Sequence, residues 1–407
     1  MADLTKYERY KPSGVVWIGE IPELWIVKHL KRYLNFYNNI RIPLSSEERA
    51  DLENIYDYYG ASGVIDKVDR YLFDGNYILI GEDGANLLDR NSPLAFKASG
   101  KFWVNNHAHI LKPINGSIDY YIYFLENIDF TVFITGSAQP KLTIEALSSV
   151  RIIVPPLDEQ LSIAKYLDTE TQKLDHLIAN KKAQAAKLKE LRQIEINNAV
   201  TKGLNPDVEI KDSGIDWLGK IPKHWEVRRL KNILININSG DGIKNDDLIE
   251  EGEFEIYGGN GVMGYTDKFN SEGKVIVIGR VGAKCGIVYL VDKRIWISDN
   301  ALKSRTYNSY EFVYYLIDAM NLNNYANQNA QPLITGGILK ALFAAIPPKN
   351  EQIQIANYLQ GRITVIDKLI QNIEDQIDKL QELRKIKIYE AVTGKIKVKA
   401  YAETATP

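Results

Sequence analysis

Lysine, arginine and amide side chains are concentrated in one stretch of the second half of the chain. Between Arg280 and Arg305 there are six Lys or Arg residues and two acidic ones, although the net charge of the 407-residue chain is only −2. Lys and Arg suit phosphate contacts, while Arg, Asn and Gln can form paired hydrogen bonds with guanine or adenine. This pattern predicts a DNA-contacting surface that contains Arg280, Lys284, Asn300, Lys303, Arg305, Gln328 and Gln331.

The first half of the chain carries a comparable but different set of polar residues. The candidate contacts there are Asn86, Arg90, Lys101, Asn105, Asn106, His107, Gln139 and Lys141. For any one residue of either set, a solvated charge or an amide that fills a turn is an equally good interpretation. Because the two sets differ in residue types, we expect two surfaces that recognise different DNA sequences.

The patterns that would indicate catalysis are absent. Residues 279–286, GRVGAKCG, lack the hydroxyl residue and the spacing of a phosphate-binding loop. The Pro-Pro pairs at 155–156 and 347–348 lack the polar residue and the aromatic ring with which adenine methyltransferases hold a flipped base. His107 and His109 could share one face of a strand, but no acidic or cysteine cluster completes a metal site. We therefore expect no catalytic site, metal or cofactor in this chain.

Two further features limit the class of protein. A single cysteine, Cys285, excludes a framework of internal disulfides. The N-terminal residues carry no apolar signal region, and no apolar run approaches the roughly 20 residues of a membrane helix. We expect a cytoplasmic protein that has no membrane partner.

The elements that position these side chains occur twice. Residues 13–31, SGVVWIGEIPELWIVKHLK, recur at 213–231 as SGIDWLGKIPKHWEVRRLK. Gly81 and Trp103 correspond to Gly279 and Trp296, and the Pro-Pro-x-x-Glu-Gln segment at 155–160 corresponds to 347–352. Each half begins with β-prone runs, such as 77–80 and 274–278, between turn signals. The sequence therefore predicts two mixed α/β domains, each large enough to bury a core.

A long helix is predicted after each Pro-Pro pair, from Leu157 to about Thr201 and from Lys349 to about Thr393. Apolar residues of the second segment alternate steps of four and three, which is typical of a coiled coil, at Leu359, Ile363, Ile366, Ile370, Ile373, Ile377 and Leu380. The equivalent stripe of the first helix is weaker and is interrupted by Lys181. We expect the two helices to pack on each other, the alternative being that each stripe packs on its own globular domain.

This ordered set of motifs resembles the specificity subunit of a Type I restriction-modification system. The resemblance rests on the Trp-x-Gly-x-Ile-Pro-x-x-Trp-x-Val-x-x-Leu-Lys openings at 17–31 and 217–231, on Gly81 and Gly279, and on the Ala-Gln-Pro and Pro-Pro-x-x-Glu-Gln segments of each half. It covers residues 13–396. Its implied fold class is α+β, with two globular recognition domains joined by two long antiparallel helices that form a coiled coil, in an internal pseudo-twofold repeat.

The resemblance implies a domain plan and a set of partners. The plan is a target recognition domain at 12–155, a spacer helix at 156–202, a linker at 203–212, a second recognition domain at 213–346, a second spacer helix at 347–396 and a tail at 397–407. Each domain would read half of a bipartite site in double-stranded DNA. The partners would be two methylation subunits and the restriction subunits, which would carry S-adenosylmethionine, ATP and magnesium. The alternative is a non-enzymatic coiled-coil scaffold with two peptide- or carbohydrate-binding domains.

Overall fold

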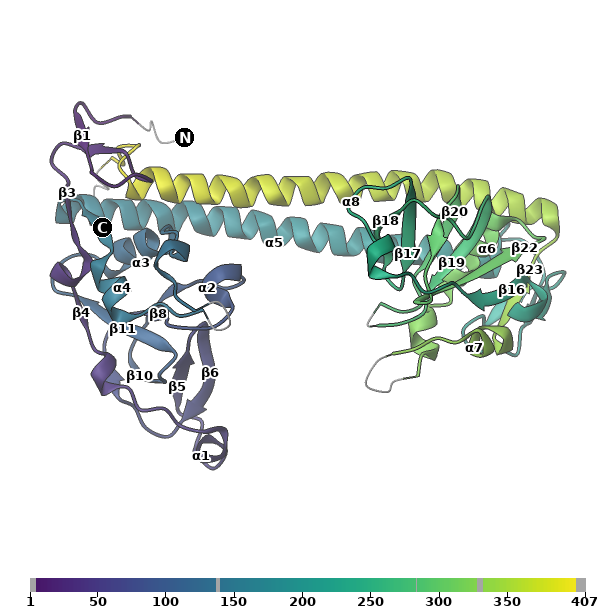
Figure 1. Ribbon diagram of the computed structural model, residues 1–407, viewed down its shortest axis with the longest axis horizontal. Coiled ribbons are helices and arrows are strands. Elements are labelled where there is room, and N and C mark those ends of the chain that lie inside the picture. The colour runs from purple at the N-terminus through teal and green to yellow at the C-terminus, as the bar shows by residue number, and fades with distance from the viewer. Residues whose placement is uncertain (1–4, 137–139, 283, 328–331, 400–407) are drawn as a thin grey trace. The chain divides into compact units, whose positions relative to one another are not determined.

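The computed structural model describes residues 5–136, 140–282, 284–327 and 332–399. Its contacts divide the chain into two compact units, of which unit 1 comprises residues 1–181 and 376–407 and unit 2 comprises 182–375. Both predicted long helices are confirmed, as α5 (Leu157–Lys202) and α8 (Lys349–Val392). The unit boundary crosses both helices, so each unit contains one globular domain, a segment of α5 and a segment of α8 (Figure 1).

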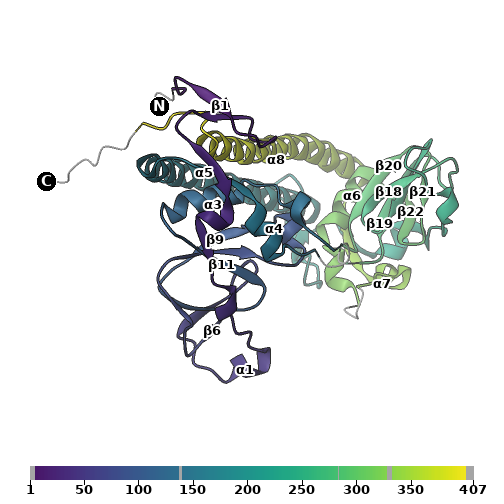
Figure 2. The same cartoon turned by 60° about the vertical axis from the view of Figure 1, so that its left-hand side comes forward.

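Two four-stranded sheets form the globular domain of unit 1, in the orders β4-β11-β8-β9 and β6-β5-β10-β7. The predicted strand at 77–80 is confirmed as β8, and α3 lies between the first sheet and α5 (Figure 2). The elements are β1 (Tyr10–Pro12), β2 (Glu20–Pro22), β3 (Ile26–His29), β4 (Leu34–Phe36), α1 (Ser46–Ala50), β5 (Tyr56–Gly60), β6 (Gly63–Val68), β7 (Phe73–Asp74), β8 (Tyr77–Gly81), α2 (Asn86–Asp89), β9 (Ala95–Ala98), β10 (Lys101–Val104), β11 (Ala108–Pro113), α3 (Ile118–Glu126), α4 (Ile144–Ser149) and β12 (Arg151–Val154).

Unit 2 repeats this plan with a four-stranded sheet, β16-β22-β19-β20, and a three-stranded sheet, β18-β17-β21. The predicted strand at 274–278 is β19, and residues 210–212 of the predicted linker form a strand that pairs with β14. The elements are β13 (Ile210–Asp212), β14 (Lys220–Pro222), β15 (Glu226–Arg229), β16 (Leu234–Ser239), β17 (Phe254–Gly258), β18 (Gly261–Thr266), β19 (Lys274–Gly279), β20 (Val288–Asp292), β21 (Trp296–Ile297), β22 (Ala301–Thr306), α6 (Tyr310–Ala319), α7 (Gly336–Ala341) and β23 (Phe343–Ile346).

Each unit pairs a segment of α5 with a segment of α8. In unit 1, Asp175 accepts a hydrogen bond from Arg384 at 2.9 Å and Glu170 lies 3.0 Å from the Lys387 ammonium. In unit 2, the ion pairs are Lys189–Glu374 (2.8 Å), Arg192–Asp367 (3.0 Å) and Glu195–Arg362 (2.9 Å). Because residue numbers rise along α5 as they fall along α8, the two segments run antiparallel within each unit.

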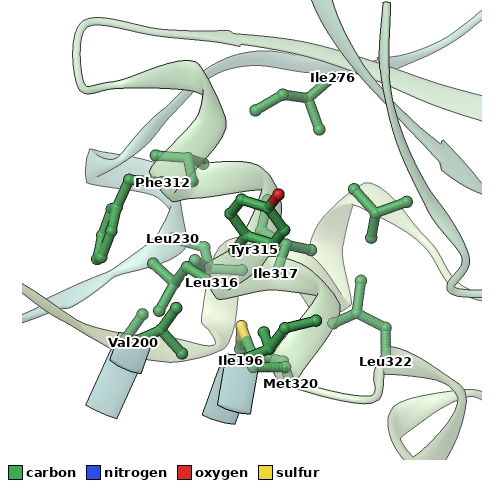
Figure 3. Packing of buried hydrophobic residues seen from close by; sticks show 14 of the residues in the cluster. Ile196, Val200, Leu230, Ile276, Phe312, Tyr315, Leu316, Ile317, Met320 and Leu322 are labelled. Carbon is green, nitrogen blue, oxygen red and sulfur yellow. The ribbon is translucent and has the colours of Figure 1, made fainter. Parts of the chain in front are cut away.

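The apolar stripes of the helices are buried within these units. Leu359, Ile363, Ile366 and Ile370 are each at most 8 % exposed and belong to the core of unit 2. The same core contains Ile196 and Val200 of α5, which lie against α6 beside Leu316 and Met320 (Figure 3). The first half of α8 thus packs both on α5 and on its own globular domain. Lys181, which interrupts the weaker stripe, is half-buried.

The repeated Trp and Glu-Gln motifs fix the start of each long helix to its globular domain. The indole N–H of Trp25 donates to Glu159 at 3.0 Å, and that of Trp225 donates to Glu351 at 3.1 Å. Both indoles are fully buried. Hydrogen bonds to charged groups contribute more than neutral ones, about 1.5–3 kcal/mol each. These Trp–Glu pairs explain why both residues recur at the same spacing.

The adjacent glutamines extend this connection to a second helix in each unit. Gln160 accepts from the backbone N–H of Ser117 and donates to the carbonyl of Pro155. Gln352 makes the equivalent bonds with Ser309 and with Pro347. The two serines are the N-caps of α3 and α6, so each glutamine joins the start of a long helix to the start of a domain helix.

Candidate nucleic-acid interface

A hairpin turn crosses the end of a central strand in each unit. The turn between β5 and β6 passes over Gly81, where a Cβ would lie 2.8 Å from the carbonyl oxygen of Ala61. In unit 2 the turn between β17 and β18 passes over Gly279, and the corresponding distance to the oxygen of Gly259 would be 2.1 Å. Only glycine allows such an approach, which explains why both strands end in this residue. The residue that follows each glycine begins the polar edge described next.

In unit 1 this edge is built around Glu82, which is 8 % exposed. Its carboxylate accepts a hydrogen bond from Arg41 at 2.5 Å and lies 3.3 Å from the Lys141 ammonium. Arg41 also donates to the carbonyls of Asn106 and Ala108, which places the loop between β10 and β11 beside Glu82. Burial alone would raise the pKa of the Glu82 carboxyl, but the bond from Arg41 and the neighbouring cations outweigh burial, so the pKa lies below its ordinary value.

Two histidines flank Glu82 and have different roles. His107 is half-exposed, and its Nδ1 lies 2.9 Å from the carboxylate of Asp83. His109 is fully buried; its Nε2 lies 2.7 Å from the carbonyl of Leu142, and its Nδ1 lies 2.7 Å from the amide of Asn38. Burial lowers the pKa of His109. His107 can therefore meet a ligand at the surface, whereas both nitrogens of His109 are engaged inside the domain.

The remaining candidates of unit 1 are spread more widely. Asn105 is buried and shapes the loop, because its side chain accepts from the backbone N–H of His107, while Asn106 is exposed. The Asn86 amide is engaged by Ser92, and Arg90 donates to the carbonyl of Ile128. Lys101 lies at the other end of β10, over the ring of Tyr71. The structure thus brings together Asn105, Asn106, His107 and Lys141, but not Lys101.

In unit 2 the equivalent edge is formed by Arg280 and Asn300. The backbone N–H of Arg280 donates to the carbonyl of Asn300 at 2.9 Å, so the two residues are adjacent. The Arg280 guanidinium donates through one terminal nitrogen to the carbonyl of Asp299 at 3.3 Å, and within the described residues its buried Nε has no hydrogen-bond partner. The Asn300 side chain is exposed. At the position after the glycine this edge has Arg280, whereas unit 1 has Glu82, whose buried carboxylate is bound by Arg41 and Lys141.

Lys303 and Arg305 lie further along β22 and face a separate hollow. Its volume is about 320 Å³, and Asn236, Asn238 and Asn270 also line it. Lys303 lies 3.7 Å from Asp241, and Arg305 donates to the carbonyl of Glu272. Lys284 is exposed at the loop before β20. Gln139, Gln328 and Gln331 lie outside the described residues.

The sequence prediction missed the central residues of the first edge, which are Arg41, Glu82 and Asp83. A signal for two of them was present, because Glu82 follows Gly81 as Arg280 follows Gly279. Aligning the repeats would have selected Glu82 once Arg280 had been chosen, and Asp83 is the residue that follows it. Arg41 had no such signal, because it reaches Glu82 from a distant loop.

These groups suit the chemistry of base edges and phosphates. Carboxylates can accept a hydrogen bond from the amino group of cytosine, while Arg and Asn can pair with guanine and adenine. Within the described ranges no three His, Cys, Asp or Glu side chains come close enough to hold a metal ion. Among the described residues, no helix has the length and apolarity that crossing a membrane requires.

The chain thus belongs to a class of proteins with two similar globular domains, each with a polar edge and with segments of two long helices. Solved structures of this class are known. One such structure, from work on the assembly and conformational transition of the type I R-M system, matches with a TM-score of 0.63 at 15 % sequence identity. The match covers 91 % of this chain and 98 % of the other. It shows that this chain shares the fold of that protein over the matched length.

The sequence comparison identifies the family. The profile described as the Type I restriction modification DNA specificity domain matches twice, at residues 22–189 and 222–379. The chain belongs to this family, whose role is DNA sequence specificity, and the resemblance seen in the sequence is confirmed. A Haemophilus influenzae protein assigned as a type I restriction enzyme specificity subunit is 28 % identical over 87 % of this chain and 92 % of its own. The MjaVIII specificity subunit of Methanocaldococcus jannaschii is 23 % identical over 93 % and 94 %.

Proposed function

We propose that this chain is the non-catalytic subunit that selects the DNA site of a Type I restriction-modification complex. Each globular domain reads one half of a bipartite site in double-stranded DNA. One observation carries the proposal: after the same strand-ending glycine, the first domain has Glu82 and the second has Arg280. A preserved scaffold that carries residues of opposite charge at this position builds two different edges, which suits two different half-site sequences.

The helices set the gap between the two half-sites and bind the partner subunits. Antiparallel ion pairs in each unit and the buried heptad stripe support an antiparallel coiled coil. The repeated Trp–Glu pairs support a pseudo-twofold arrangement, in which each end offers an equivalent surface to one of two methylation subunits. Restriction subunits complete the complex. S-adenosylmethionine, ATP and magnesium bind to the partner subunits and not to this chain.

The test is to assemble the chain with its methylation subunits and map the adenines that the complex modifies in a random DNA library. We expect one asymmetric site with two defined half-sites and a gap of fixed length. The affinity should fall steeply with salt, because Lys and Arg contacts with phosphates release counterions. Modification without a sequence preference, or at a single continuous sequence, would refute the proposal. The chain alone with S-adenosylmethionine and magnesium should leave DNA unchanged.

A further inference from the structure

A basic cleft in unit 1 lies outside the edge described above. It has a volume of about 660 Å³ and is formed by β3, the short helical turn η1 (Leu30–Arg32) that follows it, β12 and the loop at Ser13. Its lining residues are Ser13, Val27, Lys28, His29, Arg32, Tyr33 and Arg151. Three of them, Val27, Lys28 and His29, lie within the repeated Trp-x-Val-x-x-Leu-Lys motif, the last two at its variable positions. The proposed recognition of DNA by the polar edge of unit 1 does not involve the residues that line this cleft.

The positive charge of this cleft is not neutralised. Lys28, Arg32 and Arg151 form no ion pair with any residue that the structure describes, and all three are exposed. Arg151 donates to the carbonyl of Gly14 at 3.0 Å, and His29 Nδ1 lies 2.9 Å from the carbonyl of Ser149. These two bonds hold the walls of the cleft in place. They leave Lys28 and Arg32 free to bind an anion.

The duplicate in unit 2 has lost this property. Arg228 corresponds to Lys28, but it forms an ion pair with Glu226, where unit 1 has Ile26. Arg229 stacks on Phe343, which replaces Arg151, and Asn232 replaces Arg32. The duplicated frame is preserved, but among the described residues unit 1 has three cations without ion pairs lining the cleft, whereas in unit 2 Arg228 is paired and the positions of Arg32 and Arg151 hold Asn232 and Phe343. A surface used equally by two identical partners would not need this difference.

The position and floor of the cleft favour a protein ligand over DNA. In Figure 1, β3 and β4 lie along one side of unit 1, while α2 and the β5–β6 hairpin, which border the reading edge, lie along the other. Val27 and Tyr33 are half-buried lining residues, so apolar side chains of a peptide would find a surface there. Arginine forks can hold carboxylates with paired hydrogen bonds.

We propose that this cleft binds an acidic segment of a protein partner, with one such site in each chain. The carboxylates of the segment pair with Lys28, Arg32 and Arg151, and its apolar residues lie over Val27 and Tyr33. This site is independent of the two DNA-reading edges. It gives the first unit a partner that the second unit does not share.

The test uses the full chain and a fluorescein-labelled peptide of repeated Asp-Glu-Leu, followed by fluorescence anisotropy at about 0.15 M salt, where the Debye length is about 8 Å. The double variant Lys28→Glu with Arg32→Glu reverses two exposed charges that have no described partner, so its fold should be unaffected. Because two ion pairs with the peptide are lost and the reversed charges repel its carboxylates, we expect peptide affinity to fall about tenfold or more. A thermal unfolding curve should match that of the unchanged chain.

The matched control is Arg228→Glu with Lys231→Glu, which makes the same change of net charge on the equivalent strand of unit 2 and the helical turn that follows it. This control should lower peptide affinity less than about twofold, because the long-range effect of charge is screened. Equal losses in both variants would overturn the proposal, since net charge alone would then explain binding. An absence of peptide binding would also overturn it. The proposal would also be overturned if a short DNA duplex displaced the peptide and if the Lys28 and Arg32 variant bound that duplex more weakly by the same factor as it binds the peptide.

Discussion

Replacing Gly279 by alanine should disrupt the reading edge of unit 2, because the new Cβ would meet the backbone of the turn that crosses it. The new Cβ would lie 2.1 Å from the carbonyl oxygen of Gly259, whereas ordinary contacts begin near 3.4 Å. The turn between β17 and β18 would have to retreat by about 1.3 Å, the difference of these two distances. Overpacking of this kind costs about 1–3 kcal/mol. We expect the upper part of that range, because the obstructing atom is backbone.

Two alanine variants provide a scale for this effect. At Gly81 the corresponding contact, with the oxygen of Ala61, would be 2.8 Å, so the cost should be smaller. At Gly242 no atom lies within 4 Å of the added Cβ, so Gly242→Ala should have almost no effect. Hydrogen exchange followed by mass spectrometry suits this comparison, because the two units need not unfold together.

The expected result is a loss of amide protection in β17 and β18 for Gly279→Ala, corresponding to about 2–3 kcal/mol. Protection in unit 1 should be unchanged. In the assembled complex, recognition of one half-site should weaken and recognition of the other should persist. If the amides of β17 and β18 were as well protected in Gly279→Ala as in Gly242→Ala, the close approach of the turn to Gly279 would be refuted.

Further predictions concern the helices and the first edge. Glu351→Ala should cost about 1–3 kcal/mol in urea unfolding followed by tryptophan fluorescence, because Trp225 loses its acceptor, and Glu351→Gln should cost less; equal losses would contradict the Trp–Glu pairing. The pKa of Glu82 is below its ordinary 4.5, so its charged form stabilises unit 1, and this contribution is lost as pH falls from about 4.5 through the lower folded pKa. Glu82→Gln should reduce the acid sensitivity of unit 1 in that window, and an unchanged pH profile would contradict the prediction. Arg192→Ala should destabilise unit 2, since it leaves the half-buried Asp318 without its cation, whereas Lys189→Ala, which removes a more exposed pair, should have a smaller effect on thermal unfolding. Removing one heptad from both helices should change the gap length and leave the half-site sequences unaltered; changed half-sites with an unchanged gap would refute a spacer role.

The long helices could be predicted closely from sequence because their signals are local. The apolar period, the lack of proline and the Pro-Pro entries predicted α5 and α8 to within a residue or so at each end. The strand ends at Gly81 and Gly279 were also found from turn signals and duplication. The sequence did not reveal why these positions require glycine. In the structure, a backbone carbonyl from a turn about 20 residues earlier in the chain lies where a Cβ would be.

The polar edge was less predictable, because its contacts are tertiary. Lys101 and Lys141 were equally good candidates by composition, but only Lys141 lies beside Glu82. Arg90 was chosen for its charge, yet its guanidinium is engaged by the carbonyl of Ile128. Strand pairing decides which end of a strand reaches the edge, and residue type alone does not contain that information.

The central claim is that each domain reads its own half-site, and reciprocal variants at equivalent positions test it most directly. His107 and Asn300 occupy corresponding places after Trp103 and Trp296, and both are exposed. His107→Ala and Asn300→Ala should each be assembled with the methylation subunits, and the modified sites should be sequenced. We predict that each variant relaxes a different half-site by a factor of about 5–150, as expected for losing about 1–3 kcal/mol of base discrimination, with the gap unchanged. Relaxation of the same half-site by both variants, or a changed gap, would contradict the account.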